Sequence, residues 1–124
     1  MARILIIEDN PTNMKLASLV IAKAGHQVLS ADTAVDGLAL IDAEAPDLVL
    51  MDIQLPGMDG LAATRTLRAA PKTRDLKIVA LTAFAMPEDE ARIMAAGCNA
   101  YLTKPIRYKE LMTTIDTLLG SPTA

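Results

Sequence analysis

The sequence predicts an α/β protein with a parallel sheet covered by helices on both faces. Short apolar runs alternate with longer amphipathic stretches, and the alternation repeats five times within the 124 residues. Several of the short runs are apolar throughout, as in strands that are buried on both faces. Apolar residues make up 52% of the chain, so a packed core is expected. We therefore expect one doubly wound domain with five strands and five helices.

The first strand and helix are indicated by an apolar run and its capping residues. Arg3–Ile7 is the first predicted strand and His26–Ala31 the second. Between them, Asn10 is a good helix N-cap and Pro11 suits the first helical position. Gly25 is a plausible end for this helix. The chain thus begins with a strand–helix–strand unit.

The second helix and the third strand–helix unit follow the same pattern. Thr33 is the predicted cap of the second helix, which ends before Pro46. The third strand is Asp47–Met51, and its apolar run leads directly into a carboxylate and a turn. The third helix is Leu61–Ala70, and Pro71 ends it.

The last two units complete the sheet. Lys77–Leu81 is the fourth strand and Ala100–Thr103 a short fifth strand. Pro87 opens the fourth helix, whose first turn is acidic, and Gly97 closes it. Tyr108–Leu119 is the final helix. Right-handed crossovers between parallel strands leave few possible topologies for these elements.

Polar side chains follow four of the five predicted strands. Glu8 and Asp9 follow the first strand, Asp52 the third, Thr82 the fourth and Lys104 the fifth. In open parallel sheets the ligand crevice lies at this edge. Three close carboxylates would repel one another, and Mg²⁺, which prefers oxygen ligands, is the simplest compensation. With an ammonium and a hydroxyl added, the edge suits a tetrahedral dianion, and Asp52 becomes a candidate nucleophile for a phosphoryl group.

Each of these residues also has an ordinary structural interpretation. Asp9 can help to cap the first helix, and Asp52 can accept hydrogen bonds from turn N–H groups. Thr82 can be a capping hydroxyl, and Lys104 a solvated lysine. Their common place at one edge of the sheet favours the phosphoryl site over the separate structural roles.

Composition excludes several classes of function. The net charge is −3, and the chain has two Tyr, one Phe and no Trp, so a nucleic-acid partner is not expected. The single cysteine, Cys98, cannot form an internal disulfide. The N-terminal "MARILIIEDN" turns acidic too early for a signal peptide, and no apolar stretch approaches the roughly 20 residues of a membrane span. We expect a soluble, cytoplasmic protein without a membrane partner.

Four segments together resemble the receiver domains of bacterial two-component response regulators, the CheY-like fold. These segments are "LIIEDN", "DLVLMDIQLPGMDG", "IVALTAFAM" and "GCNAYLTKPI". The resemblance covers essentially the whole chain. Within the family, the chain is most similar to stand-alone DivK-type receivers and to receivers attached to hybrid histidine kinases. It implies the flavodoxin-like strand order 2-1-3-4-5 with helices on both faces.

The resemblance implies a phosphoacceptor and a metal site. Asp52 would be the phosphoacceptor in a Mg²⁺-dependent reaction. Asp9 and Asp52 would bind Mg²⁺ directly, with the backbone carbonyl of Gln54, and Glu8 would bind it through water. Gln54 and Phe84 occupy positions at which receivers vary and which tune the lifetime of the acyl phosphate.

The resemblance also implies a switch. Thr82 would be the phosphate-sensing hydroxyl and Lys104 the lysine that pairs with the phosphoryl group. Tyr101 would be the rotating aromatic residue, and the Lys104–Pro105 bond is expected to be cis. The face formed by the fourth helix, fifth strand and fifth helix would bind an unidentified downstream protein.

The expected role is therefore signalling. A sensor histidine kinase or a histidine phosphotransfer protein would donate the phosphoryl group, and the chain would catalyse only its own phosphorylation and dephosphorylation. Residues 1–120 are the expected receiver domain and residues 121–124 a tail, with no effector domain on the chain. Met1 and the complete set of elements favour a whole protein over an excised domain.

Two other functions fit the sequence less well. An aspartyl-nucleophile phosphohydrolase needs an acid/base carboxylate two residues after the nucleophile, where this chain has Gln54. A flavodoxin-like cofactor binder needs a phosphate-binding loop after the first strand, and the acidic "EDNPTN" would repel a phosphate.

Overall fold

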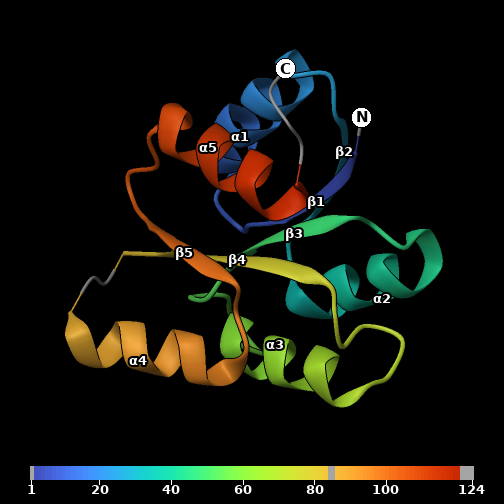
Figure 1. Ribbon diagram of the computed structural model, residues 1–124, viewed down its shortest axis with the longest axis vertical. Coiled ribbons are helices and arrows are strands. Elements are labelled where there is room, and N and C mark those ends of the chain that lie inside the picture. Colours follow the sequence, from blue (N-terminus) through green and yellow to red (C-terminus); the bar gives the residue numbers. More distant parts are fainter. Residues whose placement is uncertain (1, 84–85, 121–124) are drawn as a thin grey trace.

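A computed structural model describes residues 2–83 and 86–120 of the chain, shown in Figure 1. Phe84 and the expected tail, residues 121–124, lie outside the described residues. Within the described ranges, no helix combines the length and apolar character needed to cross a membrane.

The described residues form one sheet of five parallel strands in the order β2-β1-β3-β4-β5. The strands are β1 Arg3–Ile7, β2 Gln27–Ala31, β3 Leu48–Asp52, β4 Lys77–Thr82 and β5 Ala100–Thr103. The predicted fold class and the strand order implied by the resemblance are both confirmed. The order places β1, β3, β4 and β5, the strands followed by the candidate site residues, side by side.

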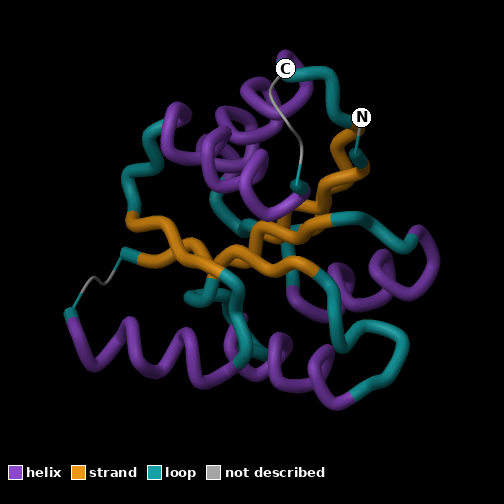
Figure 2. Tube along the Cα trace, in the orientation of Figure 1, coloured by secondary structure: helices purple, strands orange, loops and turns teal. Residues whose placement is uncertain are grey.

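Helices cover both faces of this sheet, as Figures 1 and 2 show. The helices are α1 Pro11–Lys23, α2 Ala34–Glu44, α3 Gly60–Ala69, α4 Pro87–Ala96 and α5 Tyr108–Leu119. The pair α1 and α5 lies on one face, and α2, α3 and α4 lie on the other. The layers are therefore helix, sheet and helix, with a separate apolar interface on each side.

Successive side chains of the strands enter the two interfaces alternately. In β1, Leu5 and Ile7 pack with α2, α3 and α4, whereas Ile4 and Ile6 pack with α1 and α5, and all four are fully buried. The strand β3 repeats this alternation. Because both faces are covered, neither face of the strand accommodates a polar residue, which accounts for the uninterrupted apolar runs.

Side-chain caps fix the start of three helices. Asn10, Thr33 and Asp59 each accept a hydrogen bond from the backbone N–H three residues later, at the start of α1, α2 and α3 respectively. The caps of α1 and α2 confirm the predictions for Asn10 and Thr33. The third helix begins at Gly60 rather than at Leu61, because Asp59 caps it.

Two strands extend one residue beyond their apolar runs. The strand β3 ends at Asp52 rather than at Met51, and β4 ends at Thr82 rather than at Leu81. Asp52 pairs with Leu81 in the ladder, so backbone pairing continues where the side chains become polar. Asp52 and Thr82 consequently lie on the rigid sheet rather than in the loops after it.

Candidate functional site

The carboxyl edge of the sheet gathers the polar residues that follow its strands. Glu8 and Asp9 directly follow β1, Asp52 ends β3, Thr82 ends β4 and Lys104 directly follows β5. Since these four strands are parallel neighbours, their carboxyl ends lie side by side. The structure thus places all five predicted residues at one edge.

Two of the three carboxylates are withdrawn from solvent. Glu8 is 2% exposed and Asp52 is 1% exposed, whereas Asp9 is exposed at the mouth of the site. Carboxylate oxygens of the three residues lie within 4.8 Å of one another. The backbone N–H of Asn10 donates to Glu8 Oε2 at 3.3 Å, and that of Gln54 donates to Asp52 Oδ1 at 2.9 Å. The main chain therefore orients both buried carboxylates.

One ammonium group pairs with both buried carboxylates. Lys104 Nζ lies 2.9 Å from Asp52 Oδ2 and 3.2 Å from Glu8 Oε1. The backbone N–H of Lys104 also donates to the carbonyl oxygen of Thr82 at 2.7 Å, which ties the β5–α5 loop to the end of β4. The Lys104–Pro105 peptide bond is cis.

Burial and pairing separate the proton affinities of these groups. Burial raises the pKa of Glu8 to about 7, and the neighbouring Asp52 adds to the rise. Burial alone would raise the pKa of Asp52, but hydrogen bonds with Glu8, Lys104 and the Gln54 backbone lower it below its usual value. Burial works against a charged Lys104, yet its contacts with Asp52 and Glu8 raise its pKa. At neutral pH, Asp52 is ionised and Lys104 is charged.

The donor set fits a hard divalent cation. Within the described residues, Glu8 Oε1 is buried without a hydrogen bond, and its ion pair is with Lys104 Nζ at 3.2 Å. Two further carboxylates lie close by, and Asp9 gives the group an open side. Carboxylate oxygens around a partly open position are the ligands that Mg²⁺ uses in proteins. The residues present therefore fit the expected metal.

Gln54 joins two loops across the mouth of the site. Its backbone N–H holds Asp52, and its side-chain oxygen accepts a hydrogen bond at 3.2 Å from the backbone N–H of Ala83. The sequence indicated a role for the backbone carbonyl of Gln54 but not for its side chain. A glutamine has no sequence signature for such a bridge, because the bridge depends on how two separate loops approach.

The expected switch residues lie on neighbouring strands. The side chain of Thr82 is fully buried at the end of β4. Tyr101, on β5, is half-buried and packs against the apolar cluster shared by α2, α3 and α4. The Glu90 side chain, on α4, raises the pKa of Tyr101.

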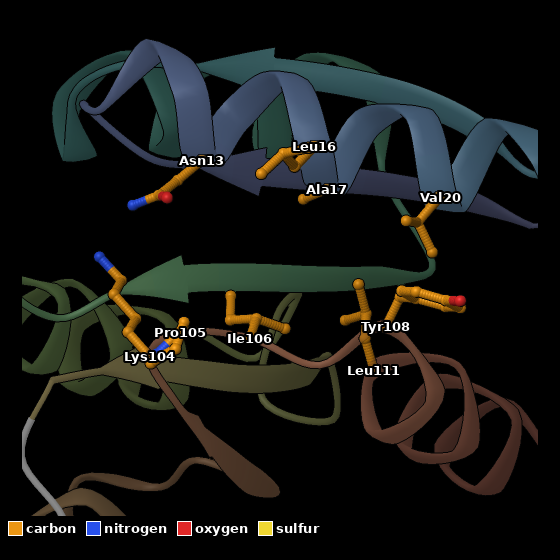
Figure 3. A pocket seen from close by; sticks show the side chains of 9 residues that line it. All are labelled: Asn13, Leu16, Ala17, Val20, Lys104, Pro105, Ile106, Tyr108 and Leu111. Atoms are coloured by element: carbon orange, nitrogen blue, oxygen red, sulfur yellow. The ribbon is translucent and has the colours of Figure 1, made fainter.

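A groove between α1 and the start of α5 leads away from Lys104, as Figure 3 shows. Its cavity has a volume of about 180 Å³. Its apolar lining is Leu16, Ala17, Val20, Ile106, Tyr108 and Leu111. Leu16 is 58% exposed and Tyr108 is 64% exposed. This groove was not predicted from the sequence, although an exposed apolar residue such as Leu16 on a helix was the available signal.

Comparison with known proteins identifies a family for this arrangement. The response regulator receiver domain family matches residues 4–116. The polar-differentiation response regulator DivK of Brucella ovis is 41% identical over 117 residues, which cover 94% of this chain and 95% of DivK.

Solved structures agree with this match. The receiver domain of the sensor histidine kinase PA1611 from Pseudomonas aeruginosa, with a magnesium ion coordinated in its active-site cleft, is 34% identical. It superposes with a TM-score of 0.89 over 97% of this chain and 98% of that domain. The chemotaxis response regulator CheY4 of Vibrio cholerae, at 24% identity, has the same fold with a TM-score of 0.90 over 95% of this chain and 98% of CheY4.

Proposed function

Because the chain belongs to the response regulator receiver domain family, which accepts phosphoryl groups in two-component signalling, we propose that Asp52 is its phosphoacceptor. The observation that carries this proposal is the position of Asp52: it is fixed at the end of a buried strand, ionised, and 2.9 Å from Lys104 Nζ. A rigid carboxylate beside a fixed cation is positioned for in-line attack on phosphorus.

The transfer exchanges one bond to phosphorus for another. An Asp52 oxygen attacks the phosphorus of a phosphohistidine, the new O–P bond forms as the N–P bond breaks, and the imidazole nitrogen keeps the electron pair. Lys104 offsets the negative charge that gathers on the phosphoryl oxygens. Asp52 itself becomes an acyl phosphate.

We assign the Mg²⁺ site to Asp9, Asp52 and the backbone carbonyl of Gln54, with Glu8 binding through water. When bound, Mg²⁺ would neutralise phosphoryl charge and orient the group towards Asp52. The buried Glu8 Oε1 without a hydrogen bond and the clustered carboxylates support this assignment. The magnesium ion in the PA1611 receiver domain supports it independently.

The site is built for accepting phosphate rather than for turning over external esters. A phosphohydrolase of the aspartyl class would need a proton-transferring carboxylate where this chain has Gln54, and an amide cannot serve. We therefore propose that the chain catalyses only its own phosphorylation and dephosphorylation.

The donor is proposed to be a sensor histidine kinase or a histidine phosphotransfer protein, docked along the α1–α5 groove. The groove is apolar and runs directly from Lys104, so a helix packed on Leu16 and Tyr108 would present its histidine to the site. Output is proposed for the face of α4, β5 and α5. There, phosphate on Asp52 would draw the Thr82 hydroxyl inward and open space for Tyr101 to turn from α4 towards the sheet.

Phosphate labelling tests the assignment of Asp52. Incubation with Mg²⁺ and a small phosphodonor should give a hydroxylamine-labile phosphate in the wild type and none in Asp52→Asn. Asp32→Asn, which changes another carboxylate just after a strand at the same edge, is the matched control and should label normally. Undiminished labelling of Asp52→Asn would refute the proposal.

A further inference from the structure

The helix α4 is attached unevenly to the rest of the protein. Its buried residues are Ile93 and Ala96, both in its C-terminal half. Residues 87–92 include none that is buried, and Met86 provides no side-chain cap for the first turn. The half of α4 that begins next to the phosphoryl site is therefore the half with the least packing.

The other end of α4, which contains the buried residues, is also held by a guanidinium group. Arg68, in the last turn of α3, donates from Nε to the carbonyl oxygen of Gly97 at 2.8 Å and from Nη2 to Asn99 Oδ1 at 2.8 Å. Its Nη1 donates to the carbonyl oxygens of Thr73 and Arg74 at 3.3 and 3.0 Å. We call Arg68 and these four partners the Arg68 anchor. It joins the ends of two helices and the α3–β4 loop.

The anchor extends into the sheet. Asn99 Oδ1 also accepts a hydrogen bond from the backbone N–H of Ile78 at 2.8 Å, and the Asn99 N–H donates to the Ile78 carbonyl at 2.8 Å. Through Asn99, Arg68 is therefore coupled to the starts of β4 and β5. Hydrogen bonds from a charged donor are stronger than hydrogen bonds from a neutral one. A cation at the C-terminus of a helix also interacts favourably with the helix dipole.

The side chain of Arg68 packs closely against the turn at Gly97. Gly97 has φ 109° and ends α4 in the left-handed conformation. A Cβ atom at this position would lie 2.7 Å from Arg68 Cγ. The absence of a side chain at Gly97 lets the aliphatic part of Arg68 pack on the turn. The guanidinium can then reach the carbonyl oxygen of Gly97.

We infer that α4 pivots about the Arg68 anchor when the site is phosphorylated, so that its N-terminal half moves and its C-terminal end stays fixed. This inference rests on the proposed function, because it concerns how that site is read out. A hinge needs one fixed end and one loosely held end, and the contacts of α4 provide both. The anchor confines the response to the N-terminal half of the helix, which carries Glu90, the residue that raises the pKa of Tyr101 on β5.

Hydrogen exchange of individual amides, measured by NMR with Mg²⁺ alone and with Mg²⁺ and beryllofluoride, tests the pivot. In the wild type, beryllofluoride should change exchange in residues 88–92 and leave the amides of Gly97, Cys98 and Asn99 unchanged. In Arg68→Ala these three amides should exchange about tenfold faster or more, the effect of losing hydrogen bonds to a charged group. The beryllofluoride response should then spread to them.

Arg65→Ala is the matched control. Arg65 lies one turn earlier in α3, is exposed, and makes no hydrogen bond or ion pair with the described residues. This variant loses the same charge and should behave as the wild type. If Arg68→Ala does not fold, Arg68→Lys keeps the charge without the fork of hydrogen bonds and should show the same faster exchange.

The outcomes separate the two proposals. Unchanged exchange of Gly97, Cys98 and Asn99 in Arg68→Ala, or an equal beryllofluoride response along all of α4 in the wild type, would overturn the pivot. Failure of beryllofluoride to shift resonances of the residues beside Asp52 would instead count against the phosphoacceptor site.

Discussion

Replacing Glu8 by glutamine should stabilise the metal-free protein at alkaline pH. Burial raises the pKa of Glu8 from an ordinary value of 4.5 to about 7, so the folded state binds this proton more tightly than the unfolded state. The resulting stabilisation is complete below pH 4.5 and is lost as the pH rises through about 7. At higher pH, folding must bury an ionised Glu8 close to an ionised Asp52.

The size of the effect follows from this shift. Each unit of pKa corresponds to about 1.4 kcal/mol, so the rise from 4.5 to about 7 means that an ionised Glu8 costs the metal-free fold about 3–4 kcal/mol well above pH 7, relative to the protonated form. A glutamine has nearly the same shape and no charge. The Asp52 pKa lies below its usual value, so Asp52 stays ionised throughout this range and adds no slope. Glu8→Gln should therefore gain about 3 kcal/mol over the wild type at pH 8 and little at pH 5.

Urea unfolding with a chelator, at pH 5 and pH 8, measures this difference directly. Millimolar Mg²⁺ should reverse the order at pH 8, because binding to the folded state stabilises the wild type more than a variant lacking one carboxylate. Glu44→Gln is a control for the loss of a glutamate charge at a site remote from the cluster. If Glu8→Gln is equally destabilised at both pH values without metal, the electrostatic account of the site is wrong.

Two further predictions concern the metal and the switch. Asp9→Ala should lose most Mg²⁺-dependent phosphate labelling, because a metal ligand is missing, and should keep its fold, because a repelling carboxylate is removed. The metal assignment would be contradicted if this variant were labelled as well as the wild type, or if EDTA left the labelling of the wild type unchanged. Thr82→Ala should still take up phosphate but lose most of the change in affinity for the downstream partner. In the wild type this change is expected to be about 5- to 150-fold, from typical couplings of about 1–3 kcal/mol. Titration of the partner with and without beryllofluoride measures the change, and an equal response in both proteins would exclude the Thr82 hydroxyl as the relay.

The fold was predictable because local signals and the global pattern agree. Apolar runs marked the strands, and Asn10, Thr33 and Gly97 cap their helices as their residue types indicate. The ends of β3 and β4 were each placed one residue short. Apolar character marks where a strand is buried, whereas backbone pairing decides where it ends, and Asp52 continues to pair after the apolar run has stopped.

The site was predictable to the level of residue type and position. Parallel strands bring their carboxyl ends together, so the residues after them could be gathered without coordinates. Contacts that depend on how far a side chain extends could not be predicted from the sequence. The bridge from Gln54 to Ala83 and the hydrogen bonds from Arg68 to Gly97 and Asn99 join segments that are distant in sequence. For Arg68 in particular, a charge pattern does not distinguish a solvated arginine from one whose guanidinium makes several hydrogen bonds.

The division of the core into two apolar clusters by the sheet has a consequence for evolution. Leu5 and Ile4 are adjacent in sequence but belong to different clusters, so a substitution at one alters a different set of helices from a substitution at the other. Changes at sites without shared contacts combine nearly additively. Helices on the α1–α5 side can therefore change their packing while the α2–α3–α4 side keeps its own. A lineage of such proteins can in this way alter one layer of helices without repacking the other.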